Sequence, residues 1–210
     1  MRSEGQPLGL YLWYLSDYPV ASEEMIRRCA RIYAENAGNS EALALLKQGA
    51  ALARKGKGKP YFPSLPGLHF SLSHSGQYGA CAFYHKPVGL DLQIHRDCNR
   101  EAIARRFFHS KEYHYLKEKE FTPFFDVWVA KESYVKYSGA GLGAGLQTFS
   151  VVDAHGLRDS LDGLRLFHHF NNGLPDNYSM CLCAGSASEE EIGSCSILRI
   201  GYSFGRSTEV

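Results

Sequence analysis

The segment from Val88 to Ile94 carries the first pair of side chains that could do chemistry. Its apolar residues alternate with polar ones, so we expect a strand with one apolar, buried face. Asp91 and Gln93 are two residues apart and therefore lie on the same face of that strand. An acid in the middle of a strand is disfavoured by intrinsic propensity. Two interpretations stay open from this segment: a functional carboxylate, or a solvent-facing strand with incidental polar residues.

The segment 126–137 carries a second group. Its periodicity predicts a helix whose core stripe is formed by Val127, Ala130, Tyr134 and Tyr137. Trp128, Glu132 and Lys136 follow one another at intervals of four residues, on roughly the opposite face. A Glu–Lys pair at such spacing is usually a surface ion pair worth a few tenths of a kcal/mol. A large aromatic in the same row argues against a fully solvated face and favours a cleft.

These two elements predict a magnesium site if the fold brings Asp91 next to Glu132. Two carboxylates, together with water or phosphate oxygens, match the hard-oxygen shell that Mg²⁺ prefers. Lys136, one turn beyond Glu132, would then reach a phosphate on the same ion. Further phosphate donors are available at Lys57, Lys59 and the Ser73–His74 turn. The combination indicates a magnesium-dependent enzyme that acts on a diphosphate.

The elements that must position these groups can be predicted from periodicity. We expect helices over about 22–35, 40–53 and 122–137 and two more within 99–119, with Ser40 and Ser110 as helix caps. We expect strands over 8–15, 68–73, 78–84, 88–94, 147–152, 164–170, 177–184 and 196–204. The predicted fold class is therefore α+β, with two similar lobes over residues 1–90 and 91–210.

Composition is that of an ordinary soluble globular protein. The 210 residues are 44% hydrophobic and 21% charged, and the net charge of +1 gives no global signature of nucleic-acid or membrane binding. Basic residues outnumber acidic ones in residues 1–90 and acidic ones prevail in 91–210, which suits an anionic ligand held beside a cation. No stretch approaches the ~18 consecutive apolar residues of a membrane span. Six scattered cysteines without a CxxC pair indicate thiols in a reducing compartment, so we expect a cytoplasmic protein.

Four segments of the chain form a familiar set. In chain order they are Gly58–Pro60, Phe70–Gly76, Val88–Leu92 and Trp128–Lys136. Together they resemble the 4′-phosphopantetheinyl transferase family, in its two-lobed, surfactin-synthetase-activating class, over about residues 20–185. The resemblance implies a pseudo-twofold α+β monomer with coenzyme A bound between the lobes. It also implies transfer of phosphopantetheine from coenzyme A to a serine of an apo acyl or peptidyl carrier protein, with release of 3′,5′-ADP.

The resemblance also implies roles for individual residues. Asp91 and Glu132 correspond to metal ligands, Glu132 also to the general base for the carrier serine, and Lys136 to the residue that neutralises the diphosphate. Contacts to coenzyme A are implied for Arg28, Arg31, Lys59, Pro60, Ser73, His74 and Lys136.

Gln93 departs from the family pattern, because many relatives have an acid at this position. A neutral amide is a poorer Mg²⁺ ligand than a carboxylate, so we expect Gln93 to complete the metal shell through a bound water. The departure leaves a second hypothesis open, a catalytically silent module that binds coenzyme A or a carrier protein. A third hypothesis is a magnesium-dependent diphosphate hydrolase.

A basic and aromatic cluster could bind the carrier protein. It consists of Arg105, Arg106, Phe107, Phe108 and Tyr113. The cluster is either the end of an amphipathic helix or a docking surface for an acidic carrier helix. We expect no nucleic-acid partner and no membrane partner.

Overall fold

The computed structural model describes residues 8–15, 23–54, 59–139, 145–168, 174–185 and 197–200. It divides the chain into two compact units. Unit 1 comprises Met1–Val88 and Ala187–Val210, and unit 2 comprises Gly89–Ser186. Both contain helices and β-sheet, so the fold is mixed α and β.

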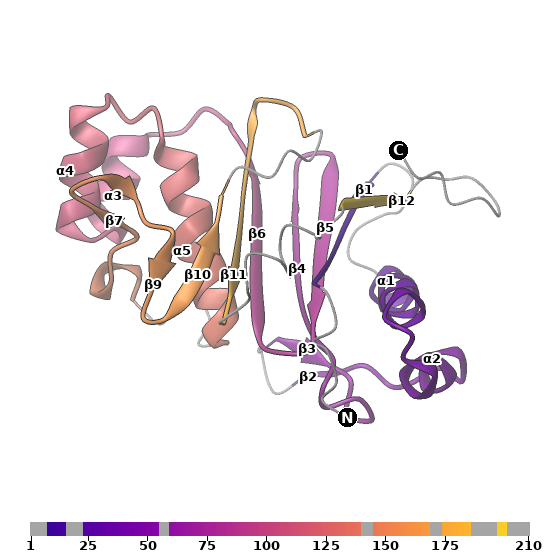
Figure 1. Ribbon diagram of the computed structural model, residues 1–210. Helices are drawn as coiled ribbons and strands as arrows, with labels where there is room; N and C mark the ends of the chain where they lie inside the picture. The colour runs from indigo at the N-terminus through magenta and orange to yellow at the C-terminus, as the bar shows by residue number, and fades with distance from the viewer. Residues whose placement is uncertain are drawn as a thin grey trace. The chain divides into compact units, whose positions relative to one another are not determined.

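A four-stranded sheet forms the centre of unit 1 (Figure 1), with the strand order β12-β1-β5-β4. The strands are β1 (Gly9–Tyr14), β4 (His69–Ser75), β5 (Tyr78–Tyr84) and β12 (Ile197–Ile200). β4 and β5 form an antiparallel hairpin, β1 is antiparallel to β5, and β12 is parallel to β1. The last described strand thus belongs to the sheet of unit 1, whereas the sequence grouped residues 91–210 as one lobe.

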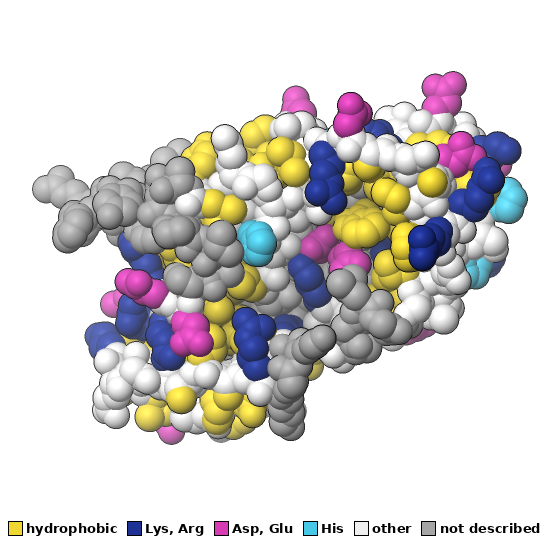
Figure 2. Space-filling model, turned by 180° about the vertical axis from the view of Figure 1, so that it is seen from behind, with side chains coloured by type: hydrophobic (Ala, Val, Ile, Leu, Met, Phe, Trp, Pro, Cys, Tyr) yellow, Lys and Arg dark blue, Asp and Glu magenta, His cyan; other side chains and the backbone are white. Residues whose placement is uncertain are grey.

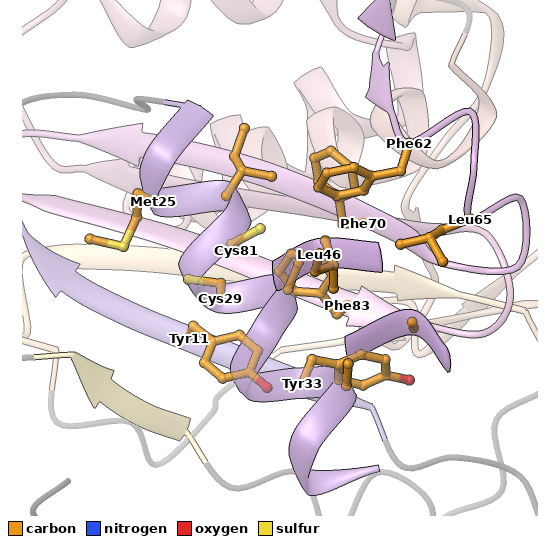
Figure 3. Packing of buried hydrophobic residues seen from close by; sticks show 14 of the residues in the cluster. Tyr11, Met25, Cys29, Tyr33, Leu46, Phe62, Leu65, Phe70, Cys81 and Phe83 are labelled. Carbon is orange, nitrogen blue, oxygen red and sulfur yellow. The ribbon is translucent and has the colours of Figure 1, made fainter. Parts of the chain in front are cut away.

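Helices α1 (Glu23–Asn36) and α2 (Ser40–Lys47) bring apolar side chains to this sheet. Figure 3 shows Met25, Cys29 and Tyr33 of α1 close to the sheet residues Phe70 and Phe83. All five side chains are buried, and the rings of Phe70 and Phe83 are stacked with centroids 5.3 Å apart. The helical periodicity predicted from the sequence is therefore confirmed for α1.

Helix α2 differs from the prediction at both ends. Its N-cap is Asn39, whose side chain accepts a hydrogen bond of 3.0 Å from the backbone N–H of Ala42, so the expected Ser40 cap is wrong. The helix ends at Lys47 because Gly49 takes a φ of +84°. The chain then forms a short antiparallel pair, β2 (Ala53–Arg54) and β3 (Pro60–Tyr61). Residues 55–58, with Lys57 and Gly58, lie outside the described residues.

Unit 2 contains a second four-stranded sheet, with the order β6-β11-β10-β9. Its strands are β6 (Val88–Ile94), β9 (Ser160–Leu161), β10 (Leu164–Phe167) and β11 (Tyr178–Ala184), and β6 begins at the boundary between the units. A small separate pair is formed by β7 (Val152–Asp153) and β8 (Gly156–Leu157). The strand expected over 147–152 is wrong, because residues 146–148 form the short 3₁₀ helix η2 (Leu146–Thr148).

Three helices complete unit 2: α3 (Arg100–Phe107), α4 (Ser110–Glu118) and α5 (Phe124–Ser138). The N-cap of α4 is His109, which forms a capping box with Glu112, so the expected Ser110 cap is also wrong. α5 packs against β11 (Figure 1) and ends at Gly139, which has a left-handed φ of +69°. No helix of the described residues is long and apolar enough to cross a membrane.

The surface shows charges of both signs. On the face drawn in Figure 2, Lys and Arg side chains are interspersed with acidic and hydrophobic ones rather than gathered into one patch. This agrees with the balanced net charge of +1.

Candidate functional site

The close crossing of α5 over β6 positions the site. A Cβ atom at Gly89 would clash with the backbone carbonyl of Ser133 and the backbone N–H of Tyr137. Only glycine therefore lets the helix lie this near the strand. Residues two and four positions further along β6 share the face of Gly89, so Asp91 and Gln93 are turned toward α5.

Asp91 and Lys136 form an ion pair across this crossing. The Nζ atom of Lys136 lies 2.6 Å from Oδ1 of Asp91. Asp91 is buried, with 5% of its surface exposed, whereas 29% of the Lys136 side chain is exposed. The predicted meeting of β6 and the 126–137 helix at these side chains is thus observed in the structure.

Glu132 completes a pair of buried carboxyl groups. It is 7% exposed, and its Oε1 atom has no hydrogen-bond partner among the described residues. Burial and, second to it, the negative charge of Asp91 raise the pKa of Glu132 to about 7, against the opposing effect of the Lys136 ammonium group. A buried carboxyl oxygen without a donor is a costly arrangement that a bound cation would relieve.

The burial of Glu132 corrects the expected pattern of α5. The sequence placed Trp128, Glu132 and Lys136 on a face opposite the core, but the helix is buried on most sides. Trp128 itself packs on the rings of Phe108 and Phe124, with centroids 6.1 Å away in each case. Glu132 is therefore a buried acid and Lys136 a partly exposed base, and the two do not form a surface ion pair.

Gln93 is two residues beyond Asp91 on β6 and is more accessible. Its side chain is partly exposed, and its Nε2 atom donates a hydrogen bond of 3.1 Å to the carbonyl of Ile94. Among the described residues, no cluster of three or more His, Cys, Asp or Glu side chains could hold a metal ion. Within the part of the chain that the structure describes, Asp91 and Glu132 are the two carboxylates available to a metal at this site.

A network of hydrogen bonds among three side chains also joins α5 to β11 and to the end of β6. The Oγ atom of Ser179 on β11 donates to Oδ1 of Asp126 at 2.6 Å and lies 2.7 Å from Nε2 of His95. Because the serine hydroxyl has a single proton, His95 must be the donor in its contact with Ser179. These hydrogen bonds hold the first turn of α5 against β11 and against His95, the residue that follows β6. No local sequence pattern indicates this set of hydrogen bonds, because its three members are far apart along the chain.

A buried ion pair lies next to Glu132 on the other side of α5. The Nζ atom of Lys131 is 2.7 Å from the carboxylate of Glu112 and donates to the carbonyl of Phe149 at 2.8 Å. Glu112 also accepts the backbone N–H groups of Val151, at 2.8 Å, and His109, at 3.0 Å. Lys131 and Glu112 are 0% exposed, so this network locks α5 to α4 and to the segment after η2.

The expected phosphate contacts of unit 1 lie on three elements. Arg28 and Arg31 are on α1. Pro60 is the first residue of β3, and Lys59 precedes it. Ser73 and His74 are near the end of β4. Ser73 is buried and His74 is exposed, as expected for neighbours on opposite faces of a strand.

Lys59 lies in a basic environment that the sequence did not predict. Its ammonium group donates to the carbonyl of Val88. Burial lowers the pKa of His69, and the positive charges of Lys59 and His85 lower it further. The pKa of His69 therefore reports chiefly its burial, and the positive charge of Lys59 comes second.

The basic and aromatic cluster is only partly on the surface. Phe107 is 43% exposed and lies under the guanidinium of Arg106 at 5.1 Å, and Arg105 donates to the hydroxyl of Tyr113 at 2.9 Å. Phe108, in contrast, is 4% exposed and stacks on Phe124, so it belongs to the core rather than to a docking surface.

Comparison with known proteins identifies the class. The sequence model of the 4′-phosphopantetheinyl transferase superfamily matches residues 87–183, which include Asp91, Gln93, Glu132 and Lys136. The 4′-phosphopantetheinyl transferase psf-1 of Bacillus pumilus is 33% identical over 171 residues, which cover 74% of this chain and 70% of the relative. The chain belongs to the 4′-phosphopantetheinyl transferase superfamily.

Two further relatives come from Bacillus subtilis. A 4′-phosphopantetheinyl transferase is 35% identical over 156 residues, covering 72% of this chain and 64% of the relative. The 4′-phosphopantetheinyl transferase Sfp of strain 168 is 38% identical over 128 residues, covering 59% of this chain and 52% of the relative. The matches thus span between about half and two thirds of these two relatives.

Proposed function

We propose that the protein transfers the 4′-phosphopantetheine group from coenzyme A to a serine of an apo acyl or peptidyl carrier protein, with Mg²⁺ as cofactor. The observation that carries this proposal is the meeting of Asp91, Glu132 and Lys136 at the crossing of β6 and α5, inside the region that matches the superfamily. The names of the relatives state the same activity for those proteins.

The residues at the crossing fit a magnesium ion. Asp91 and Glu132 offer two buried carboxylates, and Oε1 of Glu132 has no donor among the described residues. We assign to Gln93 the role of holding a water of the metal shell through its amide oxygen. Two carboxylates with waters and substrate phosphates are the usual protein environment of Mg²⁺. When bound, Mg²⁺ supplies positive charge that stabilises the phosphate oxygens in the transition state.

Side chains of the protein accept the proton of the carrier serine and stabilise the charge of the diphosphate. Glu132 accepts the proton of the carrier serine as general base. The serine oxygen attacks the β-phosphorus of coenzyme A in line with the bond to the bridging oxygen. That bond breaks, and 3′,5′-ADP leaves with the bridging oxygen and the electron pair. Lys136 stabilises the negative charge that develops on the diphosphate.

Unit 1 would hold the nucleotide part of coenzyme A. We assign the phosphate contacts to Arg28, Arg31, Lys59, Ser73 and His74, with Pro60 beside the adenine. The excess of basic over acidic residues in 1–90 supports an anion-binding role for this part of the chain.

The carrier protein would dock on the exposed part of the basic and aromatic cluster. Arg105, Arg106, Phe107 and Tyr113 combine positive charge with apolar surface on α3 and α4. Such a surface complements an acidic helix with a few apolar side chains.

The proposed architecture follows the resemblance. We propose two lobes with related folds, about 1–90 on the nucleotide side and 91–210 on the metal and carrier side, in a monomeric cytoplasmic enzyme. A four-stranded sheet in each of the two units supports two lobes, although β12 (Ile197–Ile200) pairs in the sheet of unit 1.

Release of 3′,5′-ADP tests the function directly. The protein is incubated with coenzyme A and Mg²⁺, with and without an apo carrier protein, and the nucleotide products are separated by chromatography. A transferase releases 3′,5′-ADP only when the carrier is present. Release without carrier indicates a diphosphate hydrolase, and no release with a range of carriers indicates a silent binding module.

A further inference from the structure

We propose that Lys136 is an internal counter-ion that a divalent cation must displace from Asp91. The inference rests on the proposed function in that it takes the β6–α5 crossing as the metal site. It goes further in giving Lys136 two successive partners, the Asp91 carboxylate before the metal binds and a substrate phosphate afterwards.

The ion pair occupies the position that a metal ligand needs. Nζ of Lys136 lies 2.6 Å from Oδ1 of Asp91, the carboxylate at the centre of the site. A Mg²⁺ ion binds carboxylate oxygens at about 2.0–2.1 Å. The ammonium group contacts Oδ1, and Oδ2 is the second buried oxygen of the same carboxylate. A divalent ion on either oxygen would lie close to the ammonium group, and their repulsion is large in a buried, weakly screened site.

The surroundings explain why a cation is needed there before the metal arrives. Asp91 and Glu132 are 5% and 7% exposed, so little water screens the negative charge that two carboxylates place here. Lys136 is the cation that lies on this site, at 2.6 Å from Asp91. A buried carboxylate that loses its cation is strongly destabilising.

The geometry of the lysine allows the exchange. Its side chain is 29% exposed, compared with 7% for the side chain of Asp91, so the ammonium can reach solvent without any backbone movement. Lys136 lies in the last turn of α5, and its long flexible chain can turn from the carboxylate to a phosphate on the same ion. Lys131, which is 0% exposed and fixed by Glu112, could not make such an exchange.

If this exchange takes place, one substitution at Lys136 should lower the stability of the metal-free protein and raise its affinity for a divalent ion. Replacement of Lys136 by methionine removes the counter-ion, so the metal-free protein should melt at a lower temperature. The same replacement removes the competitor of the metal, so affinity for a divalent ion should rise by about tenfold or more. A purely structural lysine would give lower stability and no gain in affinity, and a lysine that contacts only phosphate would change neither quantity.

The test uses Mn²⁺ as the probe, without coenzyme A or carrier protein. Free Mn²⁺ is followed by electron paramagnetic resonance at pH 8.5, where the carboxylates are ionised, for wild type, Lys136→Met and Asp91→Asn. Lys117→Met, at an exposed position on α4, is the matched control. We expect tighter binding in Lys136→Met, weaker binding in Asp91→Asn and no change in Lys117→Met. Equal or weaker Mn²⁺ binding in folded Lys136→Met overturns the proposal, whatever the transferase assay shows.

A second measurement uses the wild-type protein, so it does not depend on the variant folding. The rate at which Lys136 is acetylated by a water-soluble reagent is measured by peptide mass spectrometry, with and without Mg²⁺. Displacement from Asp91 should raise the rate at Lys136 severalfold and leave the rate at Lys117 unchanged. An unchanged rate at Lys136 under saturating Mg²⁺ would show that the ion pair persists and that no exchange takes place.

Discussion

Asp91 and Glu132 have a simple electrostatic relationship that explains much of the site. Each is buried and each carries a charge that opposes ionisation of the other. Such a pair stays ionised only with a cation beside it, first an ammonium group and then, by our proposal, a metal ion. The sequence predicted these residues because strand alternation and helical spacing are local properties. It could not predict the burial of Glu132, which depends on how α5 packs against the sheet.

The raised pKa of Glu132 predicts a pH dependence of stability in metal-free protein. The pKa is about 7 in the folded state, compared with 4.5 for the ordinary group, so the folded state holds this proton more tightly. The stabilisation is complete below about pH 4.5 and is lost as the pH rises through 7, by up to about 3 kcal/mol. Glu132→Gln should remove this contribution, so the variant should gain stability relative to wild type between pH 5 and about pH 8.

Urea unfolding in the presence of a chelator checks this expectation. The difference in unfolding free energy between Glu132→Gln and wild type should grow across that pH range, because other titrating groups cancel. A difference that stays constant with pH would show that Glu132 has an ordinary pKa. Added Mg²⁺ should stabilise wild type and have little effect on the variant.

Helix α5 is the element on which the account depends. It is fixed at three places: by close contact at Gly89, by the hydrogen bond between Ser179 and Asp126, and by the ion pair of Lys131. Sequence periodicity predicted the helix and its end near Gly139. It did not predict that Lys131 is buried, because a charged side chain is normally exposed and its partner Glu112 is 19 residues away.

The predictions for α2 and for residues 147–152 differ from the structure, and both differences have physical causes. Helix α2 was expected to reach residue 53, because Ala50 and Ala53 continue the helical spacing. It ends at Lys47 because Gly49 adopts a left-handed conformation, which a hydrophobic pattern cannot indicate. Residues 146–148 have the composition of a strand but form a 3₁₀ turn, and neighbouring Phe149 accepts a hydrogen bond from Lys131.

Gly89→Ala should push α5 away from β6. The added methyl group would meet backbone atoms of Ser133 and Tyr137, which cannot move aside as a flexible side chain could. We expect a loss of about 1–3 kcal/mol in unfolding free energy and weaker Mn²⁺ binding, because Glu132 would be displaced from Asp91. Gly67→Ala is the control, since its Cβ would meet no atom within 4 Å. If the two variants behave alike, close packing at Gly89 does not position the site.

Lys131→Met should destabilise the protein by about 3–5 kcal/mol, because it leaves the Glu112 carboxylate buried without its ammonium partner. Lys117→Met, at an exposed position, should stay within about 0.5 kcal/mol of wild type. Urea unfolding curves of both variants measure this contrast. A Lys131→Met protein as stable as the control would mean that the ion pair does not hold α5 and α4 together.

At the scale of the whole molecule, the two units carry complementary chemistry. Unit 1 holds basic groups around Lys59, and unit 2 holds the carboxylates of the β6–α5 crossing. The charge pattern of the sequence indicates the same asymmetry, and along the chain unit 1 passes into unit 2 between Val88 and Gly89, at the start of β6. The sequence could not predict that β12 pairs with β1, because the pairing of distant strands leaves no local pattern.

Coenzyme A and Mg²⁺ should stabilise the protein cooperatively. Diphosphate oxygens complete the metal shell, and the metal neutralises the diphosphate, so each ligand should raise the affinity for the other. The melting temperature is measured with each ligand alone and with both together. The shift with both should exceed the sum of the single shifts, and a purely additive response would mean that the ligands do not share a site.

Transfer to a carrier protein is the central claim, and intact-mass spectrometry tests it most directly. Several apo acyl and peptidyl carriers are incubated with the protein, coenzyme A and Mg²⁺, beside carriers in which the acceptor serine is replaced by alanine. We predict that at least one carrier gains the mass of a single phosphopantetheine group, that its alanine variant does not, and that Glu132→Ala and Lys136→Ala lower the rate by orders of magnitude. An unchanged mass for every carrier, with folded protein that binds both ligands, would contradict the account.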